Sequence, residues 1–211
     1  EHSIMDVTTA FWVVILLPLL SAPLIYLVGR LSVRRNPAVN PARWIALVVL
    51  VIEGVFLFFA GQSFLTQHKS YHFFLGAVTM QVDAIGLLLA AVVVSLGFFV
   101  TLFSAPYMRK EEGEEKFYPL LVILIGTIIG LGFAYDLFNL WVWFEAMAIS
   151  SYMLVAFYRS QASSLEAGVK YLLQSAVGSV FVMFAVALVF GQTGALNYEA
   201  IRLAAKPNLM L

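Results

Sequence analysis

Six long apolar runs alternate with short polar or charged stretches along the chain. A helix rises about 1.5 Å per residue, so about 20 apolar residues cross a hydrocarbon core of about 30 Å. We therefore expect membrane-spanning helices over residues 7–29, 44–65, 84–108, 117–135, 137–158 and 164–190. Glycines at positions 191 and 194 are expected to end the last span, before a short interfacial helix at 197–205. The pattern predicts an all-α integral membrane protein, a six-transmembrane-helix bundle forming a single membrane domain over residues 1–211.

Composition supports a membrane protein and removes several other classes. Hydrophobic residues make up 62% of the 211 residues and charged residues 11%, less than half the share of about 25% in soluble domains. The 12 basic residues balance the 12 acidic ones, so we expect no nucleic-acid partner. The absence of cysteine excludes disulfides and iron–sulfur clusters held by thiolates of this chain.

Local signals mark several helix ends. Asp83 and Asp136 each precede an apolar run and are expected to cap it. Ser163 and Glu166 have the spacing of a capping box, which predicts the start of the sixth span. Residues 71–82, with Gly76 near the centre, predict a small extended or hairpin element at the surface.

Two further motifs are interpreted as structural. Gly126, Gly130 and Gly132 give the fourth span a small face suited to close helix packing. His68 and His72 have a spacing that could suit a metal on a helix, but they lie in a connection without evident further ligands. We therefore expect no metal site there.

Basic residues predict the orientation, because cytoplasmic loops carry an excess of Lys and Arg. The connections after the first, third and fifth spans carry eight: Arg30, Arg34, Arg35, Arg43, Arg109, Lys110, Lys116 and Arg159. The opposite side carries three, Lys69, Arg202 and Lys206. Both termini are therefore expected on the non-cytoplasmic side.

Glu145 is the single carboxylate in the apolar run 137–158. It lies about 12 Å from the start of the expected helix, where ionisation is costly and such residues usually face a bundle interior or a water-filled path. A protonated carboxyl that only ties helices together is the alternative. We expect Glu145 to belong to an ion path.

Lys170 follows near the start of the sixth span, about 10 Å inside it. Gln174 continues its helix face, and Ser175 and Ser179 lie alongside, which favours an inward orientation. A lysine that snorkels to the interface is the alternative. We expect electrostatic coupling between Lys170 and Glu145, offset by about one to two turns, and leave direct contact open.

Glu53 is a second carboxylate in the middle of a span, residues 44–65. It is interpreted either as another relay group or as a protonated structural one.

Three stretches resemble one family. They are Val82-Asp-Ala-Ile-Gly86 leading to Phe103-Ser-Ala-Pro-Tyr-Met108, Asp136-Leu-Phe-Asn-Leu-Trp-Val-Trp-Phe-Glu145, and Leu165-Glu-Ala-Gly-Val-Lys-Tyr-Leu-Leu-Gln-Ser175. Together they resemble the antiporter-like proton-translocating subunits of respiratory complex I (NADH:quinone oxidoreductase). They are also similar to subunits of multisubunit Na⁺/H⁺ antiporters and membrane-bound hydrogenases.

The resemblance implies a role for each half of the motif. Glu145 would be the fifth-helix glutamate and Lys170 the sixth-helix lysine of a proton channel, in a larger fold of two inverted five-helix repeats. The chain would hold the N-terminal portion, three leading helices and the first three of one repeat. We expect the remaining helices from another chain or from sequence beyond these residues.

The resemblance also implies the setting. This chain would hold no cofactor, while NADH or another donor, flavin, iron–sulfur clusters and quinone belong to partner subunits. Its partners would be other membrane subunits, the lipid bilayer and protons, or Na⁺, in a bacterial or archaeal cytoplasmic membrane or an energy-transducing organelle membrane. The alternatives are a Na⁺/H⁺ antiporter subunit and a non-conducting structural bundle.

Overall fold

The computed structural model describes residues 2–35, 40–67, 70–75, 78–108, 111 and 113–204, without the side chains of 2–8, 67, 74 and 75. Six helices of this part are long and apolar enough to cross a membrane. They are α1 (His2–Arg35), α2 (Ala42–Gln67), α3 (Ala84–Phe103), α5 (Glu114–Gly132), α6 (Leu137–Val155) and α7 (Ala162–Thr193). The shorter elements are α4 (Ala105–Met108), α8 (Tyr198–Ala204) and the strands β1 (Tyr71–Leu75) and β2 (Val78–Val82). The predicted six-helix membrane bundle is confirmed.

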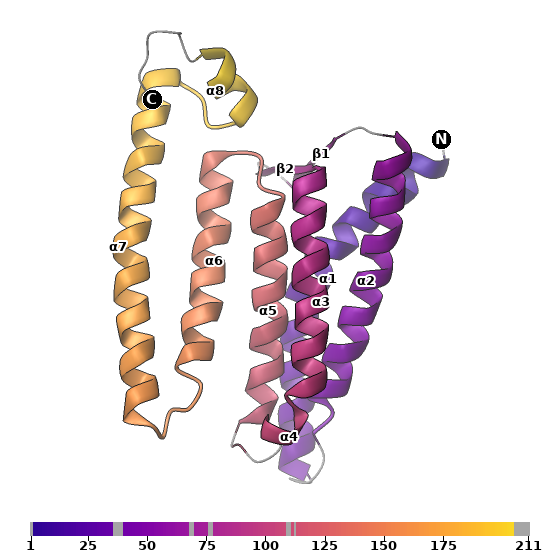
Figure 1. The fold of residues 1–211 in the computed structure, drawn as a ribbon, viewed down its shortest axis with the longest axis vertical. Helices are drawn as coiled ribbons and strands as arrows, with labels where there is room; N and C mark the ends of the chain where they lie inside the picture. Colours follow the sequence, from indigo (N-terminus) through magenta and orange to yellow (C-terminus); the bar gives the residue numbers. More distant parts are fainter. Residues whose placement is uncertain are drawn as a thin grey trace.

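The helices run up and down, with α6 and α7 set in a row beside a tighter group of α1, α2, α3 and α5 (Figure 1). α5 joins the two parts, since it packs against α1, α2 and α3 on one side and against α6 on the other. α7 packs mainly on α6 and α8. The hairpin, α8 and the start of α1 lie at one end of the bundle, and α4 and the α6–α7 turn lie at the other (Figure 1).

Glycines allow α5 to occupy the central position. A Cβ at Gly126 would lie 2.8 Å from the ring of Pro18 on α1, and one at Gly130 would lie 2.5 Å from the indole of Trp143 on α6. Gly132 faces α3 in the same way. The predicted small-residue face is therefore confirmed, and its three glycines contact three different helices.

Both predicted aspartate caps are confirmed. Asp83 Oδ1 accepts the backbone N–H of Gly86 at 2.7 Å, and Asp136 Oδ1 accepts that of Asn139 at 2.6 Å. Each satisfies one of the free N–H groups at a helix start.

The predicted capping box is wrong. Ser163 lies inside α7, whose N-cap is Gln161 without a side-chain bond. Glu166 instead pairs with Lys170, and Ser164 Oγ donates to the carbonyl of Val155 at the end of α6. That last bond satisfies a terminal carbonyl of α6, which ends at Val155 and not at residue 158.

The predicted continuous span 84–108 is also wrong, because it bends at Ser104 between α3 and α4. Pro106 has no N–H to donate to the carbonyl of Leu102, which instead accepts from Arg43 Nη2 at 3.5 Å. A similar correction applies to Gly191, since α7 continues through it and ends at Gly194, which has a φ of 67°.

The hairpin predicted over residues 71–82 is confirmed as the antiparallel pair β1–β2. It closes over the end of the bundle, where Gln81 N–H donates to the carbonyl of Phe133 at 2.8 Å. Asn139 Nδ2 on α6 donates to the carbonyl of Thr79 at 3.1 Å. These bonds tie the hairpin to the turn between α5 and α6.

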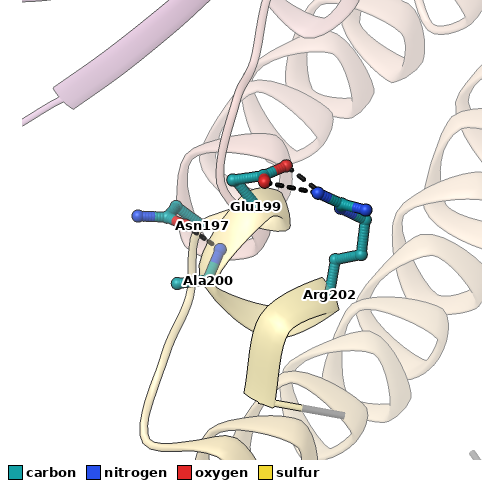
Figure 2. Close-up of polar contacts among 4 residues, drawn as sticks. All are labelled: Asn197, Glu199, Ala200 and Arg202. Atoms are coloured by element: carbon teal, nitrogen blue, oxygen red, sulfur yellow. Dashed lines mark hydrogen bonds and ion pairs between the residues drawn. The ribbon is translucent and has the colours of Figure 1, made fainter.

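α8 stands at the same end and carries its own polar contacts (Figure 2). Asn197 Oδ1 caps it by accepting the N–H of Ala200 at 2.7 Å. Arg202 donates twice to the Glu199 carboxylate, at 2.6 and 3.2 Å. A β-bridge between Asp136 and Asn197 connects α8 to the start of α6.

Some residues that the sequence analysis singled out lie outside the described part of the chain: His68, Lys69, Gly76, Arg109, Lys110 and Lys206.

Candidate proton-path site between α6 and α7

Glu145 lies in the middle of α6, well over two turns after the Asp136 cap. Its side chain is half-buried, and Oε1 is enclosed without a hydrogen-bond partner among the described residues. Burying a polar atom without a hydrogen-bond partner costs free energy. We therefore expect Glu145 Oε1 to bind a proton, or to gain a hydrogen bond from water or from another chain.

Trp141 lies one turn before Glu145 and fixes the adjacent part of α7. Its Nε1–H donates to Ser179 Oγ at 2.8 Å, and Ser179 is 7% exposed. Ser179 therefore faces α6, as an inward polar stripe requires. Sequence reasoning did not single out Trp141, although its spacing of four residues from Glu145 places it on the same helix face.

A groove of about 250 Å³ lies between α6 and α7, and Phe144, the residue before Glu145, is part of its lining. Phe144, Met147 and Ala148 form its α6 wall, and Gln174 and Ser175 bring polar groups to it from α7. Gln174 is exposed and Ser175 half-buried. The groove thus extends along α7 from Tyr171 to Val182, and its lining includes neither Glu145 nor Lys170.

Lys170 itself points elsewhere. Its side chain is 73% exposed, and Nζ pairs with Glu166 Oε1 at 2.5 Å, one turn earlier on α7. The structure does not bring Lys170 into contact with Glu145.

The levels of the two residues explain the separation. Gly168 packs against Ala156, where a Cβ would lie 2.6 Å from that of Ala156. Lys170 is two residues past this contact, whereas Glu145 is eleven residues from it on antiparallel α6. The difference of nine residues corresponds to about 13 Å along the axes. Side chains or water in the groove must span this distance if the two groups exchange a proton.

Glu53 belongs to a different part of the bundle. It lies on α2, which packs against α1, α3 and α5, and it is fully buried. Among the residues that the structure describes, no group of three or more His, Cys, Asp or Glu side chains could hold a metal ion. Glu53 and Glu145 thus lie in different parts of the bundle, and intramembrane carboxylates of this kind are typical of proton pathways.

Two family models match neighbouring parts of the chain. Residues 75–118 match the complex I (NADH-ubiquinone oxidoreductase) chain 5 N-terminus, and residues 134–211 match the NADH:quinone oxidoreductase/Mrp antiporter transmembrane family. The second match contains Glu145, the groove and Lys170. These two stretches of the chain are thus similar to antiporter-like membrane subunits. The resemblance predicted from sequence is therefore confirmed.

Relatives of this antiporter-like chain include NADH-quinone oxidoreductase subunit L of Escherichia coli K12, 30% identical over 123 residues. Subunit N of Francisella tularensis subsp. holarctica is 32% identical over 114 residues. These matches cover 58% and 54% of this chain but only 20% and 24% of the relatives. The antiporter-like chain thus corresponds to a small part of each relative.

A solved structure supports the fold. A chain of the membrane-bound sulfane sulfur reductase, an archaeal respiratory membrane complex, superposes with a TM-score of 0.81 at 24% identity. The match covers 91% of the antiporter-like chain and 39% of that chain.

Proposed function

We propose that this chain is part of a proton-translocating subunit of a redox-driven NADH:quinone oxidoreductase-type complex, with Glu145 and Lys170 in the proton path. The observation that carries the proposal is Glu145, a carboxylate in the middle of a spanning helix whose enclosed Oε1 has no hydrogen-bond partner among the described residues. The redox groups, flavin, iron–sulfur clusters and quinone, belong to partner subunits. The complex lies in an energy-transducing membrane with both termini of this chain on the non-cytoplasmic side.

Electrostatic coupling supplies the mechanism. A negative charge at Glu145 favours the charged form of Lys170, and protonation of Glu145 removes that effect. Lys170 then releases its proton toward Gln174 and Ser175, and Glu166 holds the lysine when it is charged. Redox-driven change near Glu145 alternates these two states.

The test measures proton translocation in vesicles that hold the assembled complex. Glu145→Gln and Lys170→Ala are expected to reduce translocation by roughly a hundredfold or more, the loss typical of a proton-transfer group, while assembly is retained. Glu199→Gln is the matched control, because it neutralises an exposed carboxylate on α8 and should leave translocation unchanged. Full translocation in both test variants would overturn the proposal.

A Na⁺/H⁺ antiporter subunit is the second candidate, favoured by the antiporter members of the family matched at residues 134–211. Replacing Na⁺ by K⁺ in the same vesicles separates the two, because only an antiporter loses its proton flux. A third candidate, a non-conducting bundle, is favoured by the exposed position of Lys170. It requires that both test variants retain full translocation.

A further inference from the structure

Glu53 is the most completely enclosed charged side chain in the described part of the bundle. Its exposure is 0%, and neither carboxylate oxygen has a hydrogen-bond partner within the described residues. It lies at the centre of α2, about equally far from both helix ends. The mechanism proposed above does not use it.

The packing around α2 places Glu53 at the level of a proline kink. Gly29 on α1 meets Ala42 on α2, where a Cβ on Gly29 would lie 3.1 Å from that of Ala42. The two helices run in opposite directions. Pro18 lies eleven residues before Gly29 on α1, and Glu53 lies eleven residues after Ala42 on α2, so the two residues are at the same level of the bundle. Pro18 in turn packs against Gly126 of α5.

The third neighbouring helix closes the same layer. Leu50, about one turn before Glu53, and Ile125 of α5 both approach Gly97 of α3. Glu53 is therefore surrounded by the tightly packed middle of α1, α3 and α5, where a proline and two glycines bring the backbones close together.

No opposite charge faces Glu53 from these helices. The stretches 7–29 of α1, 84–103 of α3 and 117–132 of α5 contain no charged residue and no histidine. The other charged residues with described side chains on α1, α2 and α5 lie toward the helix ends: Arg30, Arg34 and Arg35 on α1, Arg43 on α2, and Glu114, Glu115 and Lys116 on α5.

The buried hydroxyls of the same helices are already engaged. Ser21, Thr101 and Thr127 each donate to a backbone carbonyl of their own helix. An ionised Glu53 carboxylate would thus be buried with neither a counter-charge nor a described donor, which is energetically unfavourable. The neutral acid avoids that cost.

The kink on α1 leaves one backbone acceptor without its usual helical donor. Pro18 has no N–H, so it cannot donate to the carbonyl of Val14, one turn earlier on α1. The O–H of a neutral Glu53 is a hydrogen-bond donor, and the carbonyl of Val14 lacks one. A metal cation fits poorly, because Na⁺-like and Ca²⁺-like ions need several oxygen ligands and Glu53 supplies one carboxyl group.

We propose that Glu53 is a second proton-binding site of this chain: a carboxylic acid in the α1–α2–α3–α5 bundle that is occupied at neutral pH and exchanges its proton separately from Glu145 and Lys170. Glu53 precedes both stretches matched by the family models, 75–118 and 134–211. The proposal does not depend on translocation, since occupancy is measured at rest.

Infrared difference spectroscopy of the assembled protein in lipid vesicles tests the site. The wild-type spectrum minus that of Glu53→Gln should show one C=O stretching band of a neutral carboxylic acid at neutral pH, and the band should shift in D₂O. The band should persist in Glu145→Gln, which removes the other mid-span carboxyl. If Glu53→Gln does not fold, Glu53→Asp should shift the band instead of removing it.

Carboxylate bands at neutral pH, in place of the neutral-acid band, would overturn the site. A neutral-acid band that never shifts in D₂O would overturn exchange. Loss of the band in Glu145→Gln would overturn the separation of the two carboxyl groups.

Discussion

Gly130, in the last turn of α5, and Gly54, in the middle of α2, differ in their surroundings. A Cβ on Gly130 would approach three atoms of the Trp143 indole, at 2.5–2.6 Å, whereas one on Gly54 would meet nothing within 4 Å. The indole is rigid and lies between α5 and α6, so it cannot yield as the end of a flexible side chain can. Close packing of α5 on α6 therefore depends on the missing side chain at position 130.

We expect Gly130→Ala to destabilise the bundle by about 1–3 kcal/mol, because overpacking forces side chains or backbone to shift. Gly54→Ala is the matched control and should stabilise it by up to about 1 kcal/mol, the helix preference of Ala over Gly. Titration with a denaturing detergent, followed by circular dichroism, measures both. Equal stabilities of the two variants would contradict the packing assigned to Gly130.

Glu145 and Glu53 show what a sequence can predict about a site. A carboxylate inside an apolar run is energetically costly, which singles out both residues. The sequence shows this directly, because only the neighbouring residues of the same run are needed. Their surroundings are not local: Glu145 lies on α6, which packs between α5 and α7, and Glu53 is enclosed by three other helices. The bond from Trp141 to Ser179 likewise joins residues that are 38 positions apart.

At the scale of the element, the helices could be predicted but several of their ends could not. An apolar run requires helical backbone in lipid, because each N–H and C=O must be satisfied within the segment. Caps formed by Asp83 and Asp136 depend on neighbouring residues and were predicted correctly. The bend at Ser104 involves Arg43, which donates to a carbonyl 59 positions away. Periodicity and propensity contain no information about such contacts.

α8 is short enough that its own ion pair should affect its stability. The hydrogen bond from Arg202 holds the pKa of the Glu199 carboxyl below its ordinary value of 4.5 (Figure 2). A lowered pKa means that the stabilisation is fully present above the ordinary value and is lost as the pH falls through the folded-state value. Both side chains are exposed, so solvent limits the effect.

We therefore expect amide exchange in α8, corrected for the intrinsic pH dependence, to accelerate as the pH falls below 4.5. Glu199→Gln should exchange faster than wild type at neutral pH and should lose this additional pH dependence. Protection that is independent of pH in the wild type would show that the pair does not stabilise α8.

For the whole molecule, the arrangement of the helices decides where Lys170 lies. α1, α2, α3 and α5 enclose one another, whereas α7 contacts mainly α6 and leaves large apolar side chains such as Phe181 and Phe184 exposed. Sequence favoured an inward Lys170 because Gln174, Ser175 and Ser179 share its side of the helix. In the structure Ser179 faces α6, whereas Lys170 lies on the open surface. The polar side chains of α7 spread over a wider part of its circumference than α6 alone can cover.

The distribution of basic residues over the bundle predicts its orientation in the membrane. Arg34 and Arg35 end α1, Arg43 begins α2, and Arg159 lies in the α6–α7 turn, all at one end of the bundle (Figure 1). The opposite end carries α8 with Arg202. Since basic ends remain in the cytoplasm, the α6–α7 turn should be cytoplasmic and α8 should lie on the other side.

Single cysteines test this orientation cleanly, because the chain has no cysteine of its own. Gln161, in the α6–α7 turn, and Gln192, near the far end of α7, are both exposed. A membrane-impermeant maleimide should label Gln192→Cys in intact cells and should label Gln161→Cys only after the membrane is opened. The reverse pattern would invert the bundle. It would then place the α6–α7 turn, and with it the end of α7 that carries Lys170, on the non-cytoplasmic side.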